Sequence, residues 1–142
     1  VSHSVVYVKM VQIKNSTAQK ILLAEDEEFV ARSYIRKLEL EKYTVIHAHN
    51  GEEALALLKT EKPDLAILDL MMPLKTGFEV LEAIKTGTDE ELKKIPVIVA
   101  SNLGQKSDID TARGLGAVDF LVKSNISLKE LLAKVREYLP LG

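Results

Sequence analysis

From Lys20 onward, short apolar runs alternate with longer stretches in which apolar residues recur at helical spacing. The short runs are rich in Ile, Leu and Val on both faces, as expected for buried strands of a parallel sheet. Five runs are predicted to be strands: residues 20–24, 44–48, 65–69, 96–101 and 118–122. This βα rhythm predicts an α/β fold, a doubly wound parallel sheet with one crossover helix after each strand.

Helix start signals follow the predicted strands. A Ser, Thr or Asn side chain caps a helix by accepting a backbone N–H, and an acidic residue three positions later completes a capping box. The candidate caps are Asn50, Thr76, Ser107 and Ser127. Apolar spacings of three and four then predict which helix residues are buried against the sheet. These residues are Leu55, Leu58, Val80, Ile84, Leu128, Leu131, Leu132 and Val135.

The first 19 residues do not continue this rhythm. Val6, Val8 and Met10 alternate with other residues in a weak period-2 pattern, which could form an extra edge strand or pair two chains. Nothing downstream requires a sixth strand, so we favour a flexible leader. The prediction is therefore a leader over residues 1–19 and a single domain over residues 20–142.

The composition of the chain argues against several classes of function. The 142 residues include 19 basic and 21 acidic side chains that are well mixed, so no basic field for direct nucleic-acid binding is expected. The absence of cysteine excludes disulfides, thiolate metal sites and a cysteine nucleophile. No stretch approaches the roughly 18 consecutive apolar residues of a membrane span. We expect a soluble, cytoplasmic protein with no membrane contact.

Polar residues gather at the predicted carboxyl ends of four strands. In a doubly wound sheet, ligands bind at this edge, where the strand order reverses. The residues are Glu25, Asp26, Asp69, Ser101 and Lys123. Clustered carboxylates favour a hard divalent cation, most simply Mg²⁺. Asp69, held at a rigid strand end, suits a carboxylate nucleophile toward phosphorus, and a lysine and a hydroxyl can stabilise the transferred charge.

Simpler interpretations exist for each residue alone. A strand-end Asp often caps the next helix, and the acidic residues 25–28 could complement a helix dipole. A phosphate-binding loop after the first strand would contain Gly, Ser or Thr, whereas this acidic loop would repel phosphate. A phosphatase of the haloacid-dehalogenase type would have a second Asp two residues after the nucleophile, where this chain has Met71. The combination of four strand ends favours a phosphoacceptor.

The segments that contain these residues resemble receiver domains of bacterial response regulators, in particular the single-domain chemotaxis type. The matching motifs are ILLAEDE at residues 21–27, ILDLMMP at 67–73, TGFE at 76–79, PVIVAS at 96–101 and DFLVK at 119–123. The resemblance covers residues 20 to about 139. It implies a flavodoxin-like (βα)5 fold with strand order 2-1-3-4-5.

The resemblance also implies how the site works. Asp69 would accept a phosphoryl group from a sensor histidine kinase or a histidine phosphotransfer protein. Asp26, Asp69 and the backbone carbonyl of Met71 would bind Mg²⁺ directly, and Glu25 would act through water. The protein would be a signalling switch of a two-component phosphorelay, not an enzyme with a separate substrate.

The switching residues follow from the same resemblance. Ser101 and Lys123 would bind phosphoryl oxygens, and Phe120 would turn inward as the aromatic switch, although plain packing of Phe120 stays an alternative. The fourth helix, fifth strand and fifth helix would form the face that binds an unidentified downstream protein. A monomer or weak dimer is expected.

The chain departs from the family pattern at several positions. Glu25 stands where Asp is usual, and Ser124 stands where proline usually follows the lysine. Because a cis bond before a non-proline residue costs about 3 kcal/mol, we predict a trans bond there. In the family, the residues two past the phosphoacceptor and two past the hydroxyl influence how water reaches the phosphoryl group. Here they are the apolar Met71 and Leu103, which cannot orient a water molecule, so slow self-dephosphorylation is predicted.

Two other functions stay open at this point. The changes at Glu25 and Ser124 leave room for a constitutive, unphosphorylated interaction module. A metal-dependent phosphohydrolase is a further alternative, but no separate acid/base group is visible. The sequence ends directly after the last predicted helix, without an output domain, which fits a stand-alone regulator or a domain cut from a longer protein.

Overall fold

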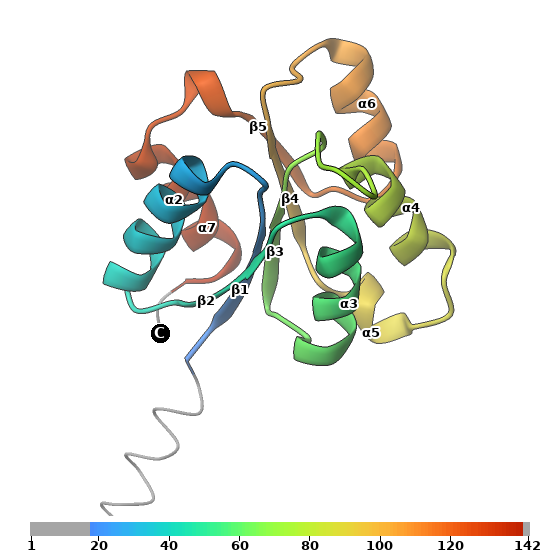
Figure 1. Ribbon diagram of the computed structural model, residues 1–142, viewed down its shortest axis with the longest axis horizontal. Helices are drawn as coiled ribbons and strands as arrows, with labels where there is room; N and C mark the ends of the chain where they lie inside the picture. Colours follow the sequence, from blue (N-terminus) through green and yellow to red (C-terminus); the bar gives the residue numbers. More distant parts are fainter. Residues whose placement is uncertain (1–17, 141–142) are drawn as a thin grey trace, which may run out of the picture.

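The computed structural model describes residues 18–140, which form a five-stranded parallel sheet with helices on both faces (Figure 1). The strands are β1 (Lys20–Ala24), β2 (Thr44–Ala48), β3 (Leu65–Leu68), β4 (Val97–Ser101) and β5 (Asp119–Val122). The helices are α2 (Glu28–Leu40), α3 (Gly51–Glu61), α4 (Gly77–Thr86), α5 (Glu90–Lys93), α6 (Lys106–Gly114) and α7 (Leu128–Tyr138), with a 3-10 turn η1 (Lys123–Asn125). The sheet order β2-β1-β3-β4-β5 confirms the predicted order.

The predicted leader falls almost entirely outside the described residues, which begin at residue 18. Three strands differ by one residue from their predicted bounds, because β3 ends before Asp69, β4 starts after Pro96 and β5 starts after Val118. None of the helices within residues 18–140 is long and apolar enough to cross a bilayer.

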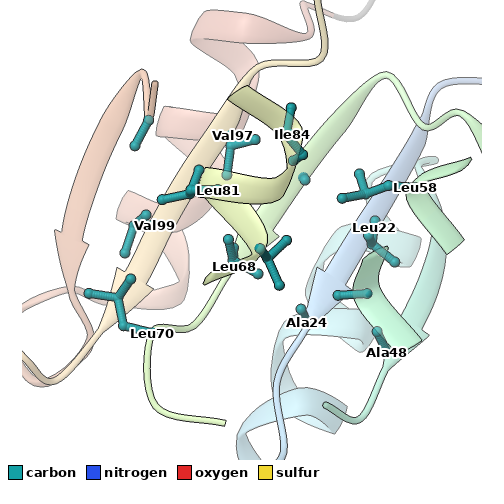
Figure 2. Packing of buried hydrophobic residues seen from close by; sticks show 14 of the residues in the cluster. Leu22, Ala24, Ala48, Leu58, Leu68, Leu70, Leu81, Ile84, Val97 and Val99 are labelled. Carbon is teal, nitrogen blue, oxygen red and sulfur yellow. The ribbon is translucent and has the colours of Figure 1, made fainter. Parts of the chain in front are cut away.

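The sheet separates two apolar layers. Along β1, Ile21 and Leu23 pack with α2 and α7, whereas Leu22 and Ala24 pack with α3 and α4. Figure 2 shows the second layer, in which Leu58 of α3 and Leu81 of α4 meet the strand residues. Each fully buried Leu contributes about 1.5–3 kcal/mol to folding stability relative to an exposed one. Because helices cover both faces of the sheet, the strands are apolar on both faces.

Three of the predicted caps are confirmed. The Asn50 side chain accepts the N–H of Glu53 at 2.8 Å, and Thr76 and Ser127 each form a complete capping box. These caps fix where α3, α4 and α7 begin. Because each of these helices starts just beyond the carboxyl end of the sheet, the caps also position the loops at that edge.

The predicted cap at Ser107 is wrong. Helix α6 already begins at Lys106, and the Gln105 carbonyl accepts the N–H groups of Asp108 and Ile109. An ion pair of 2.9 Å between Lys106 and Asp110 stabilises the earlier start. Ser107 therefore lies inside the first turn, where its own carbonyl accepts the hydroxyl of Thr111.

Three further features differ from the sequence prediction. Leu128 is 38% exposed, because it occupies the first position of α7 and the buried face of that helix starts at Leu131. Leu55 is only partly buried, although it packs against the α3 and α4 layer as expected. The short helix α5, capped by Asp89, was not predicted because four residues are too few to show a periodic pattern.

The Asp119 carboxylate in β5 contacts side chains of α7, and these contacts predict how much Asp119 stabilises the fold. It accepts the N–H of Phe120 at 2.9 Å and the Tyr138 hydroxyl at 3.1 Å, and it pairs with Lys134 at 3.2 Å. Burial alone would raise the pKa of Asp119, but these contacts hold the pKa below its ordinary value. A carboxylate with a lowered pKa stabilises the fold above its unfolded pKa, about 3.9, and loses that effect as the pH falls through the folded pKa.

Asp119→Asn is therefore expected to lower the free energy of unfolding by about 1 kcal/mol at neutral pH, and by less in acid. Urea unfolding of both proteins at about pH 7 and about pH 3 measures this difference. An equal loss at both pH values would contradict the proposed contribution of the charge.

Candidate functional site

A pocket of about 480 Å³ opens at the carboxyl ends of the strands, where the order reverses between β1 and β3. It is lined by Asp26, Glu27, Asp69, Met71, Met72, Pro73, Ser101, Asn102, Leu103 and Lys123. The structure thus brings together five of the predicted site residues. Glu25, which is 2% exposed, and Phe120 are not among the lining residues.

Two buried carboxylates share the ammonium group of Lys123. The Lys123 Nζ lies 2.6 Å from Glu25 Oε1 and 3.0 Å from Asp69 Oδ2. All three side chains are less than a tenth exposed, so these charges interact in a medium far less polarisable than water. The remaining oxygens are also bonded, because Glu25 accepts the N–H of Glu27 and Asp69 accepts the N–H of Met71.

The neighbouring charges shift the pKa values of Glu25 and Lys123. Burial raises the pKa of Glu25, and the nearby Asp69 carboxylate adds to this rise, while the bond from Lys123 opposes it. Burial alone would lower the pKa of Lys123, but its bond to Glu25 and the charge of Asp69 raise that pKa overall. Lys123 is therefore a firmly protonated cation held at the oxygen atom of Asp69 that faces it.

The acidic side chains also form a set suited to a cation. One carboxylate oxygen each from Glu25, Asp26 and Asp69 lie within 4.8 Å of one another, and Asp26 is exposed at the pocket mouth. A donor set made only of oxygens, open to solvent on one side, fits Mg²⁺, which keeps several water ligands.

Ser101 and its neighbour Asn102 connect two strand-end loops. Ser101, 1% exposed, accepts the N–H of Leu103 with its hydroxyl oxygen at 3.3 Å. Asn102 accepts the N–H of Ser124 at 3.1 Å. No cis peptide bond occurs within residues 18–140, so the predicted trans bond before Ser124 is confirmed. A proline at 124 would lack the N–H that Asn102 uses.

Sequence reasoning missed Asn102, although its position directly after the strand-end serine was a usable signal. Phe120 is partly buried and packs against the α3 and α4 layer, while its N–H donates to Asp119. The position of Phe120 fits both interpretations drawn from the sequence, plain packing and an aromatic switch.

Gly77 approaches the backbone of Asp69 closely. A Cβ atom at Gly77 would lie 2.2 Å from the Asp69 carbonyl oxygen, and the Gly77 N–H donates to the Leu70 carbonyl at 3.0 Å. Since backbone atoms cannot give way cheaply, Gly77→Ala is expected to lower the free energy of unfolding by at least about 2 kcal/mol.

Gly114 provides the matched control for Gly77→Ala, because nothing lies within 4 Å of a Cβ atom there. Gly114→Ala at the end of α6 is expected to raise the free energy of unfolding by about 0.5 kcal/mol. Urea unfolding measures both variants. Equal stability of the two variants would contradict the close packing at Gly77.

The sheet order, the flanking helices and the carboxylate–lysine pocket together define an α/β domain of the chemotaxis-regulator type. The family profile of the response regulator receiver domain matches residues 21–136. The chain therefore belongs to the response regulator receiver family, and it is a signalling receiver domain of a two-component system. Receiver domains of this family use Mg²⁺.

Curated relatives share this domain. The "Probable transcriptional regulator ycf27" of Porphyridium aerugineum is 40% identical over 121 residues, which is 85% of this chain and 48% of the relative. "Response regulator MprA" of Mycobacterium ulcerans is 35% identical over 120 residues, 84% of this chain and 50% of the relative. The chain thus spans about half the length of these relatives.

Solved structures show the same fold. The receiver domain of the putative Luxo repressor protein from Vibrio parahaemolyticus superposes with a TM-score of 0.77 at 30% identity, covering 86% of this chain and 90% of that one. The chemotaxis protein CheY4 of Vibrio cholerae gives a TM-score of 0.78 at 25% identity, covering 86% and 99%.

Proposed function

We propose that Asp69 is the phosphoacceptor of this receiver domain, and that a sensor histidine kinase or a histidine phosphotransfer protein supplies the phosphoryl group. The observation that carries the proposal is the contact of 3.0 Å between Lys123 and the Asp69 carboxylate at the mouth of the pocket. An Asp69 oxygen attacks phosphorus as the bond to the donor histidine breaks, and the transferred group stays on Asp69.

The surrounding residues stabilise the transferred charge. Asp26, Asp69 and the backbone carbonyl of Met71 would hold Mg²⁺, with Glu25 acting through water, and the ion supplies positive charge at the phosphoryl oxygens. Lys123 pairs with one phosphoryl oxygen, and the Ser101 hydroxyl donates to another. Before transfer Lys123 is shared between Glu25 and Asp69, so its cation is already in place.

Phosphorylation would act as a population shift. Movement of the Ser101 hydroxyl, whose oxygen accepts from Leu103, toward the phosphoryl group would shift the loop that the adjacent Asn102 links to Ser124. This movement would let Phe120 turn inward and would change the face formed by α6, β5 and α7, which binds an unidentified downstream protein.

The proposal covers a receiver unit at residues 20–142, cytoplasmic and monomeric or weakly dimeric, with residues 1–19 as a leader. The direct test is intact mass after incubation of the full chain with acetyl phosphate, with Mg²⁺ or with a chelator. Gain of one phosphoryl group only with Mg²⁺ supports the proposal. No gain, with Mg²⁺ binding verified separately, would instead favour a constitutive, unphosphorylated interaction module.

Slow loss of the phosphoryl group is the next prediction. Met71 and Leu103 line the pocket beside Asp69, and neither side chain can hydrogen-bond an attacking water. After removal of excess donor, the phosphorylated protein is expected to persist for minutes or longer at room temperature, as followed by intact mass. A half-life of a few seconds would contradict this expectation, and Met71→Asn should shorten the lifetime.

A further inference from the structure

A second group of ligand-type side chains lies at the outer edge of the sheet, beyond the pocket. His47 is in β2, His49 follows that strand, and Glu28 is the first residue of α2. One ligand atom from each of these three residues lies within 4.8 Å of the other two. The two imidazole centroids are 4.0 Å apart. Two segments distant in sequence, the start of α2 and the end of β2, therefore place two nitrogen ligands and one oxygen ligand together.

Hydrogen bonds leave one ring nitrogen of each histidine available. The His47 Nε2 lies 2.8 Å from the backbone carbonyl oxygen of Glu25, and the His49 Nδ1 lies 3.0 Å from Glu53 Oε1. A carbonyl and a carboxylate can only accept, so these ring nitrogens carry hydrogen. In the neutral imidazoles, the lone pairs are then at Nδ1 of His47 and Nε2 of His49. Metal-binding histidines usually have such a fixed acceptor on the other nitrogen.

The distance between two of the ligand atoms fits coordination of one ion by both residues. The His49 Nε2 lies 3.4 Å from Glu28 Oε1. In tetrahedral zinc sites, with metal–ligand distances of about 2.0–2.1 Å, neighbouring ligand atoms are about 3.4 Å apart. A protonated His49 between Glu28 and Glu53 is the competing explanation of the same distances.

We propose that Glu28, His47 and His49 bind a borderline transition-metal ion, with Zn²⁺ as the probe, and that Glu53 orients His49. Imidazole nitrogen selects such ions, whereas the all-oxygen set at Asp26 and Asp69 selects Mg²⁺. The two sites meet at Glu25, whose carbonyl accepts from His47 while its carboxylate pairs with Lys123. The proposal does not depend on phosphorylation.

Zn²⁺ titration of the full chain by calorimetry, with excess Mg²⁺ present, tests this site. The chain has three histidines and no cysteine, so His3→Ala is the matched control for His47→Ala and His49→Ala. We expect one bound Zn²⁺, at least a tenfold loss of affinity in either site variant, and no change in His3→Ala or Asp69→Asn. Glu53→Ala, which removes the carboxylate that orients the His49 ring, should weaken binding about tenfold.

Histidine ¹⁵N NMR of the unaltered chain gives a second readout that does not depend on variants folding. Zn²⁺ should shift Nδ1 of His47 and Nε2 of His49 while His3 stays unchanged. Zn²⁺ affinity that survives both site substitutions, or ring signals that report only a protonated His49 without a Zn²⁺ response, would overturn the proposal.

Discussion

Asp69→Asn is expected to abolish phosphorylation by acetyl phosphate completely, as measured by intact mass with Mg²⁺ present. The amide keeps the shape of the side chain, and its oxygen can still accept the N–H of Met71, but it is not a nucleophile toward phosphorus. It also removes one negative ligand of the proposed Mg²⁺ site. The matched control is Asp110→Asn on the exposed surface of α6, which should be phosphorylated at the unaltered rate.

The loss in Asp69→Asn should not result from unfolding. Asp69 is 5% exposed and shares one lysine with Glu25, so the cluster contains one buried negative charge in excess. With Asn at this position, Glu25 and Lys123 remain as a matched pair. We expect urea unfolding to show equal stability or a gain of about 1 kcal/mol. A phosphoryl gain in Asp69→Asn would place the acceptor elsewhere.

The fold could be predicted because the strands are largely apolar on both faces and the polar residues concentrate at their boundaries. Parallel topology then brings residues as distant as Glu25 and Lys123 to one edge, so the meeting of these charged side chains could also be predicted from the sequence. The start of α6 could not be placed, since a cap at Ser107 and a start at Lys106 differ by less than one turn.

Features that depend on packing between elements escaped prediction. The sharing of Lys123 by Glu25 and Asp69 needs side-chain directions at the ends of three strands. The Asn102 bond to Ser124 depends on how two loops meet. His47 and His49 look like ordinary strand and turn residues until α2 brings Glu28 beside them, so periodicity alone could not reveal that cluster.

Lys123→Met is expected to lower the free energy of unfolding by about 3 kcal/mol, because it leaves two buried carboxylates without their cation. Without Lys123, the pKa of Glu25, already raised by burial, should rise further. A group with a raised folded pKa stabilises the fold below its unfolded pKa and loses this effect as pH increases through the folded pKa. The penalty of Lys123→Met should therefore be largest at neutral pH and shrink in mild acid.

A double-mutant cycle separates this electrostatic cause from lost packing. Adding Glu25→Gln to Lys123→Met removes one uncompensated charge, so the pair should lose less stability than the sum of the single variants. Lys129→Met, at an exposed position of α7, is the matched control and should be nearly neutral. Urea unfolding at neutral and mildly acidic pH measures five proteins: the unaltered chain, the two single variants, the double variant and the Lys129→Met control. If the penalty were independent of both pH and Glu25, Lys123 would be acting through its aliphatic stem, and the shared cation would have to be abandoned as the organising feature of the pocket.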